Sequence, residues 1–189
     1  MSPEGRRREL PGAHARALPP DEERRWREIQ ERFRAVREKM VAGIRVSAED
    51  LKFPHLEQRR VLDALHVPDD AGEHAAALEE VLRRIPDGWG RFIECERGWY
   101  PLVVELDRSL GELDPDYTML QVKQKWGHLV CYFESHADNS AEMDGLVLDA
   151  MERSKTICER CGKPGVLTAD RLGKVQTLCS TCQEGQSGG

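Results

Sequence analysis

The sequence is short of aromatic residues and of long apolar runs. Phe, Trp and Tyr together make up 6% of its 189 residues. No apolar run approaches the ~20 residues of a membrane-spanning helix, and no signal-peptide hydrophobic segment is seen near Met1. We therefore expect a cytoplasmic protein without a membrane partner, in a reducing compartment that keeps its six cysteines out of disulfides.

The sequence also has no excess of positive charge. The formal net charge is -6 at pH 7. Residues 51–150 carry 20 acidic and 10 basic side chains, whereas residues 1–50 carry 10 and 12, and residues 151–189 carry 4 and 6. A chain with this balance is not an obvious binder of polyanions.

What the sequence does contain is a pair of Cys-x-x-Cys motifs near its end. Cys158 and Cys161 form the first, Cys179 and Cys182 form the second, and 17 residues separate the two motifs. This spacing predicts a four-cysteine zinc site. Four protein ligands leave no open coordination position, so the motifs predict one structural Zn²⁺ per chain and no catalytic metal.

Two disulfides or two redox-active pairs are the alternatives for these cysteines. A redox Cys-x-x-Cys normally opens a helix within a βαβ unit, and no such pattern surrounds either motif. We expect residues 157–183 to form a zinc ribbon or knuckle, with a short hairpin over 166–178 that leads into Cys179.

The first 86 residues predict a tail and then a helical region. Residues 1–20 are polar and rich in Pro and Gly, which is typical of a disordered tail. Residues 21–86 predict three helices, at about 21–41, 56–65 and 70–85. The first helix carries an apolar stripe at 3-4-3-4 spacing: Trp26, Ile29, Phe33, Val36 and Met40. Packing on the protein's own core is the favoured interpretation of this stripe, and a homodimer seam through the Trp26–Met40 helix is the alternative.

Residues 87–156 predict an α+β domain. A short strand at 91–95 precedes an amphipathic helix over 99–113. Two alternating segments, 117–124 and 128–134, predict a β-hairpin with Leu120, Val122, Leu129, Cys131 and Phe133 on its buried face.

A last helix is expected from Ser140 to about Lys155, directly before the cysteines. Residues 184–189 predict a disordered tail. The fold class is therefore α+β: N-terminal helices, a core of one helix and a β-hairpin, and a C-terminal zinc module.

Several pieces of the second half resemble a family of uncharacterised small proteins of bacteriophages, prophages and bacteria. They are Cys95-Glu-Arg-Gly-Trp-Tyr-Pro-Leu102, Leu120-Gln-Val-Lys-Gln-Lys-Trp-Gly127, and the 157–165 and 177–179 segments around the cysteines, within residues 87–182. Family members often end the site with Cys-x-x-His, where this chain has Cys182. The resemblance implies a small α+β domain with an attached zinc knuckle and no established catalytic activity.

Basic and aromatic side chains on the hairpin and around the cysteines form a possible binding surface. This alternation is typical of proteins that bind single-stranded nucleic acid. The candidates are Tyr117, Lys123, Lys125, Trp126, Arg160, Lys163, Arg171 and Lys174. The alternative is an ordinary solvated hairpin with Trp126 folded back on the core.

Three functions fit these features. The favoured one is a non-enzymatic, zinc-stabilised adaptor that engages a protein partner, in a phage or prophage setting. The second is a zinc-ribbon-like nucleic-acid-binding protein. The third is a metal-dependent nuclease built on His128, His136, Asp138 and Asn139, although loop residues of these types are expected before a helix in any case. Cys95 and Cys131 are expected to be small buried apolar residues and not nucleophiles.

Overall fold

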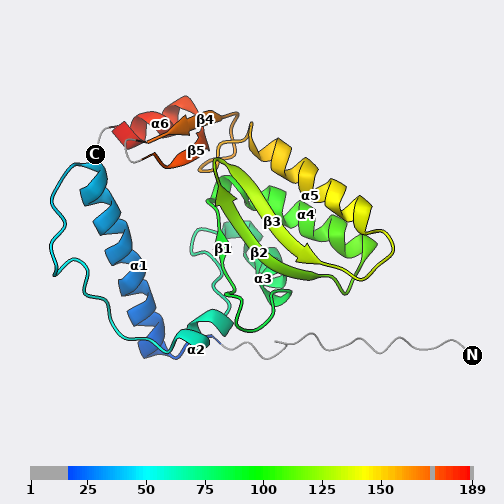
Figure 1. Cartoon of the computed structure of the whole chain (residues 1–189), viewed down its shortest axis with the longest axis horizontal. Coiled ribbons are helices and arrows are strands. Elements are labelled where there is room, and N and C mark those ends of the chain that lie inside the picture. Colours follow the sequence, from blue (N-terminus) through cyan, green and yellow to red (C-terminus); the bar gives the residue numbers. More distant parts are fainter. Residues whose placement is uncertain (1–16, 171–172, 188–189) are drawn as a thin grey trace, which may run out of the picture.

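The structure is a computed structural model that describes residues 17–170 and 173–187. The described residues form six α-helices, two short 3₁₀ helices and two small sheets, which confirms the α+β class (Figure 1). The helices are α1 (Pro20–Val41), α2 (Gln58–Asp63), α3 (Ala75–Arg83), α4 (Tyr100–Leu113), α5 (Ser140–Ser154) and α6 (Ser180–Ser187), with 3₁₀ turns η1 (Gly72–His74) and η2 (Arg97–Trp99). The strands are β1 (Ile93–Glu94), β2 (Thr118–Lys125), β3 (His128–Glu134), β4 (Val166–Ala169) and β5 (Val175–Leu178).

The main core lies between the larger sheet and helices α3, α4 and α5. The strand order is β1-β2-β3, with β1 parallel to β2 and β2 antiparallel to β3. Pro101 occupies the first turn of α4, where its missing N–H costs nothing. Side chains at helical spacing then bury one face of α4, including Leu106 and Leu110. The predicted helix and hairpin of this domain are thus confirmed.

One prediction about the hairpin face is wrong. Val122, Leu129 and Cys131 are buried as expected, but Met119 and not Leu120 fills the core. The strand register shifts between Met119 and Gln121, which is a bulge in the β2–β3 ladder. Because side chains alternate between faces with a period of two, one extra residue turns Leu120 away from the core.

Helix α1 stands apart from this core as an arm (Figure 1). None of its residues is buried. Trp26 packs near its start against His66 and Phe92, with ring centroids 5.1 and 5.6 Å apart. Farther along, Phe33 and Met40 are 59% and 51% exposed. The expected packing on the protein's own core therefore holds only near the start of the helix, and the homodimer seam stays a prediction.

The described ends of both predicted tails are ordered. Residues 1–16 lie outside the described part of the chain, but Leu18 is buried in a small cluster with Val61 and Ala64. At the other end, α6 continues to Ser187, beyond the expected start of the tail at 184. Among the described helices, none has the length and apolar character needed to cross a membrane.

Candidate metal centre

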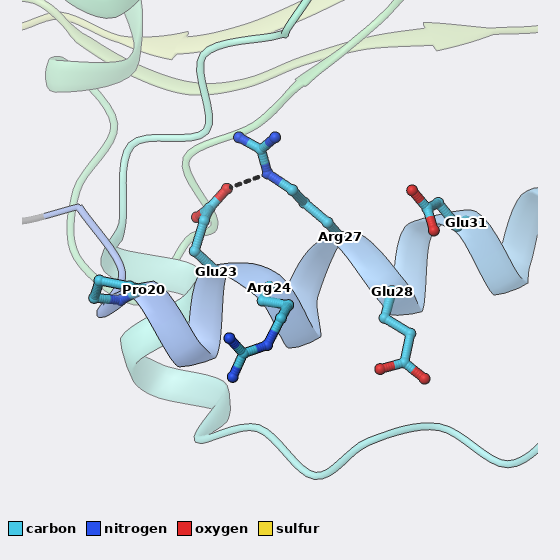
Figure 2. Close-up of a pocket in the computed structure, with 6 residues that line it drawn as sticks. All are labelled: Pro20, Glu23, Arg24, Arg27, Glu28 and Glu31. Atoms are coloured by element: carbon cyan, nitrogen blue, oxygen red, sulfur yellow. Dashed lines mark hydrogen bonds and ion pairs between the residues drawn. The ribbon is translucent and has the colours of Figure 1, made fainter.

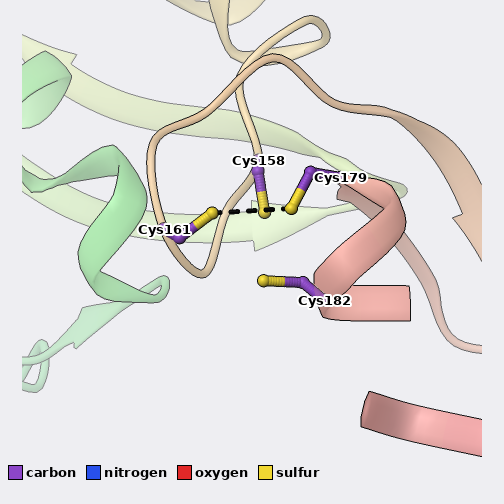
Figure 3. Close-up of side chains that lie close together, drawn as sticks. All are labelled: Cys158, Cys161, Cys179 and Cys182. Carbon is purple, nitrogen blue, oxygen red and sulfur yellow. Dashed lines mark hydrogen bonds between the residues drawn. The ribbon is translucent and has the colours of Figure 1, made fainter. Parts of the chain in front are cut away.

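The four predicted cysteines come together at one point (Figure 3). Cys158 and Cys161 lie in the loop after α5, and Cys179 and Cys182 lie at the start of α6. All four Sγ atoms lie within 4.8 Å of one another, and those of Cys161 and Cys179 are 3.6 Å apart. A tetrahedral metal–thiolate site with bonds of about 2.3 Å has sulfur–sulfur edges of about 3.8 Å. The cluster can therefore hold one metal ion after small side-chain movements.

Backbone hydrogen bonds shape the first Cys-x-x-Cys turn. The Cys158 N–H donates to the Lys163 carbonyl at 2.7 Å, and the Gly162 N–H donates to the Cys158 carbonyl at 2.9 Å. Gly162 has a φ of 75°, a conformation that glycine adopts without steric cost. These contacts hold Cys158 and Cys161 in a tight turn around the point where the sulfur atoms meet.

The thiols differ in acidity because their surroundings differ. The backbone N–H of Cys182 donates to the Cys179 sulfur and lowers the pKa of Cys179 to about 7. Burial, together with the neighbouring thiols, raises the pKa of Cys182 to about 12. Four thiolates this close repel one another unless a cation neutralises them. A bound cation would remove this repulsion, so the four thiols suit a metal site.

The cysteine module, defined here as residues 157–187, is bound tightly to the core through η2. The Gly98 N–H donates to the Glu159 carbonyl at 2.7 Å, and the Trp99 Nε1–H donates to the Ile157 carbonyl at 2.8 Å. Trp99 is fully buried. A β-carbon at position 98 would lie 2.5 Å from the Gly162 amide nitrogen, which explains the need for glycine there. The Cys95–Leu102 segment therefore forms the platform on which the first cysteine turn rests.

The module also contacts the tip of the β2–β3 hairpin. The Thr177 hydroxyl donates to the Gly127 carbonyl at 2.6 Å, and the Gln124 side-chain amide donates to the Val175 carbonyl. The side chains of Leu167 and Val175 lie directly against Gly127. The β4–β5 hairpin thus packs on the core hairpin, and Thr177 lies two residues before a cluster cysteine.

Trp126 sits at the tip of the core hairpin in an unusual conformation. Its φ is 55°, and it is the only non-glycine residue with positive φ in the described part of the chain. Together with Gly127 (φ 80°) it forms a two-residue turn of the type that favours Asn-Gly. The side chain is 66% exposed, so the expectation that Trp126 folds back on the core is wrong.

The other residues of the predicted binding surface differ in burial and in their contacts. Tyr117 is fully buried and donates its hydroxyl to Asp107 at 2.6 Å, so it cannot belong to a surface. Arg160 is ion-paired with Glu96 at 3.2 Å. Lys163 is exposed on the first cysteine turn, and Arg171 lies outside the described residues. Lys123, Lys125 and Lys174 lie on the hairpin and the β4–β5 turn.

Two of these lysines border a cleft between the sheet and the cysteine module. The cleft has a volume of about 420 Å³. Acidic and basic side chains share its wall: Glu94, Glu96, Glu159, Lys123 and Lys174. Glu159 is 2% exposed, burial raises the pKa of its carboxyl, and the Gln176 amide donates to it at 3.1 Å. The wall therefore offers no continuous positive surface.

A second hollow, of about 560 Å³, lies along α1 (Figure 2). Its lining comes entirely from this helix: Pro20, Glu23, Arg24, Arg27, Glu28 and Glu31. Arg27 donates to Glu23 at 3.0 Å, one turn away on the same helix. Such i,i+4 pairs are ordinary features of an exposed helix face, and we assign the hollow no chemistry.

The residues of the nuclease hypothesis do not form a site. His128 lies on β3, whereas His136 and Asp138 are separate residues of the loop before α5. Within residues 17–170 and 173–187, the four cysteines are the only group of three or more His, Cys, Asp or Glu side chains placed to hold a metal. Cys95 and Cys131 are buried as predicted, and burial raises the pKa of each thiol.

Sequence reasoning missed the contacts between the cysteine module and the core. Leu167 was expected only as part of a short hairpin over 166–178, and no contact was expected at Gly98. The module touches the core at Gly98 and Gly127, and no local sequence pattern indicates either contact. Comparisons with protein-family models, with curated proteins and with solved structures find no match to this chain.

Proposed function

We propose that this chain is a non-enzymatic binding protein that is stabilised by one Zn²⁺ ion and engages a protein partner through Trp126. The donor set supports zinc, because four cysteine thiolates in a compact cluster suit its tetrahedral, sulfur-rich coordination. Cys158, Cys161, Cys179 and Cys182 would supply every ligand. A closed site of this kind contributes to folding and does not activate water or substrate.

The observation that carries the proposal is the state of Trp126. A left-handed conformation costs a non-glycine residue roughly 1–2 kcal/mol. Leaving an indole 66% exposed forgoes most of the free energy of burying it. A residue whose backbone conformation and whose exposure both cost free energy marks a functional site more often than a structural one. Tryptophan is also among the residues that contribute most to protein–protein interfaces.

The charges of the cleft beside the core hairpin favour a protein partner over a long nucleic-acid strand. Glu94, Glu96 and Glu159 lie in the cleft beside Lys123, and Arg160 is already paired with Glu96. A nucleic-acid strand that runs from Trp126 along this cleft would bring its phosphates against these carboxylates as well as the lysines, whereas a peptide segment docked on Trp126 need not enter the cleft. A folded protein or peptide can match a mixed surface of this kind.

Nucleic acid remains the second candidate because Lys125 stands next to the exposed indole, an arrangement that suits stacking on a base. The two functions differ in their salt dependence. Binding of an oligonucleotide would weaken steeply as salt rises, with a slope that counts the phosphates contacted. The phage or prophage setting implied by the resemblance also stays a prediction.

Affinity purification from the source cell tests the proposal. The bait is the full chain, as wild type and as Trp126→Ser, after nuclease treatment of the lysate. Trp89→Ser is the matched control, because Trp89 is also an exposed indole, at 51%, and lies outside the hairpin tip. We expect a protein that wild type and Trp89→Ser retain and Trp126→Ser loses. Equal recovery with all three baits would contradict the proposal.

A further inference from the structure

We infer that Trp126 and Leu167 form one composite docking surface, built half from the core hairpin and half from the cysteine module, and that it takes an acidic peptide segment with an apolar anchor residue. The inference rests on the proposed function and specifies the partner's chemistry. It also makes the binding surface depend on the metal, because Leu167 belongs to the module that the metal stabilises.

The composite nature of the surface follows from the contacts at the hairpin tip. Leu167 on β4 packs against Gly127, the residue after Trp126. Leu167 is nevertheless 61% exposed, and its neighbour Val166 is 64% exposed. Leu167 therefore packs on the residue next to the exposed indole, across the contact between two parts of the fold, and exposed apolar side chains gathered in this way are typical of the centre of protein interfaces.

Each half of this surface carries an exposed lysine, Lys125 on the core hairpin and Lys174 on the β4–β5 connection. Lys174 interacts electrostatically with the buried Glu159 carboxyl, whereas Lys125, next to Trp126 in the chain, makes no hydrogen bond or ion pair within the described residues. Of the carboxylates in the neighbouring cleft, Glu96 is paired with Arg160 and Glu159 is buried, which leaves Glu94 as the exposed one. An apolar centre with lysines at its rim is complementary to an apolar side chain flanked by Asp or Glu.

Contacts to the core hold the two halves of the surface together. The Thr177 hydroxyl and the Gln124 amide fasten the β4–β5 hairpin to the core hairpin. Thr177 leads within two residues to Cys179, and the Glu159 N–H, next to Cys158, donates to the Thr177 carbonyl at 2.9 Å. Loss of the cluster would release β5, and Leu167 would then leave Trp126.

A peptide-display selection tests the inference. Random 12-residue peptides are selected against the zinc-loaded full chain, and binding of the enriched peptides is measured by fluorescence anisotropy. We expect sequences with Leu, Phe or Trp flanked by Asp or Glu. Their affinity should fall at least tenfold with Trp126→Ser and with Leu167→Ser, and should stay unchanged with Leu148→Ser, which alters an equally exposed leucine on α5. The double variant Lys125→Glu, Lys174→Glu should also lower the affinity of these peptides.

The possible outcomes separate this inference from the proposed function. Enriched peptides that need Trp126 but are basic, or are unaffected by Leu167→Ser, would overturn the composite acidic-peptide site and leave Trp126 as a protein anchor. Peptides that bind independently of Trp126, or no enrichment at all, would overturn both. A 12-nucleotide oligo-thymidine that binds through Trp126 and competes with the peptides would reassign the surface to nucleic acid.

Discussion

The amide N–H of Gly98 donates to the carbonyl oxygen of Glu159 at 2.7 Å, which joins the core to the middle of the first cysteine turn. The approach is so close that position 98 has no room for a β-carbon. Three residues separate Cys158 from the end of α5 along the chain, and η2 holds the turn in place. The four-cysteine cluster and the core thus form one connected structure.

Substituting Gly98 should destabilise both the core and the first cysteine turn. Gly98→Ala forces backbone against backbone, and we expect it to lower the free energy of unfolding by about 2 kcal/mol or more. Gly145→Ala is the control, because Gly145 lies in α5 with nothing within 4 Å of an added β-carbon. That change should raise stability by up to about 1 kcal/mol. Urea unfolding measures both, and an unaffected Gly98→Ala protein would contradict the tight docking.

The metal content of the purified protein checks the cluster itself. We expect about one zinc per chain by elemental analysis, and less than a tenth of that in Cys161→Ser. Cys131→Ala is the control, since Cys131 is a buried cysteine outside the cluster. It should lose some stability from its cavity and keep its zinc. Zinc retained by Cys161→Ser, or lost by Cys131→Ala, would argue against the four-thiolate site.

Trp126 should lower the free energy of unfolding of the protein. Asn-Gly is the preferred pair for this two-residue turn, so Trp126→Asn should raise the free energy of unfolding by about 1 kcal/mol. Partner binding should be lost in the same variant. Thermal unfolding compares it with wild type. A marked decrease in stability would mean that the indole packs as a structural residue, and the proposed function would lose its main support.

The attachment of the α1 arm should depend on pH. His66 lies against Trp26 and stacks on Phe92, and burial lowers the pKa of its imidazole below 6.5. The folded state therefore disfavours the protonated form. Above about pH 6.5 His66 is neutral in the folded and the unfolded chain, and its burial costs no free energy of protonation. Below that pH the unfolded chain binds the proton more readily, and the free energy of unfolding falls. Urea unfolding at pH 7.5 and 5.5 should show this loss in wild type and a smaller one in His66→Phe.

Much of the fold was predictable because local patterns and tertiary packing agree. The apolar spacing of α4 and α5 and the alternation of β3 each bury the face that the pattern indicates. The four cysteines were predictable because metal ligation fixes their spacing. The register of the hairpin was not, since the bulge after Met119 has no signature in the sequence.

The remaining differences concern side chains whose burial depends on contacts with distant parts of the chain. A local sequence pattern does not indicate such contacts. The stripe on α1 predicts an apolar face, but whether the core or solvent meets Phe33 depends on where the arm is anchored, at Trp26. Tyr117 looked like a surface aromatic because its neighbours alternate, and it is buried with its hydroxyl on Asp107. The role of Leu167 became visible only with its contact to Gly127.

The central claim is that the metal cluster holds the Trp126 surface in place, and fluorine NMR tests it most directly. The protein is labelled with 5-fluorotryptophan, and Trp126→Phe assigns the Trp126 signal among the four tryptophans. The account predicts that a chelator shifts and broadens this signal in proportion to the zinc removed, whereas the exposed Trp89 signal changes little. A Trp126 signal that stays unchanged after complete loss of zinc would contradict the claim.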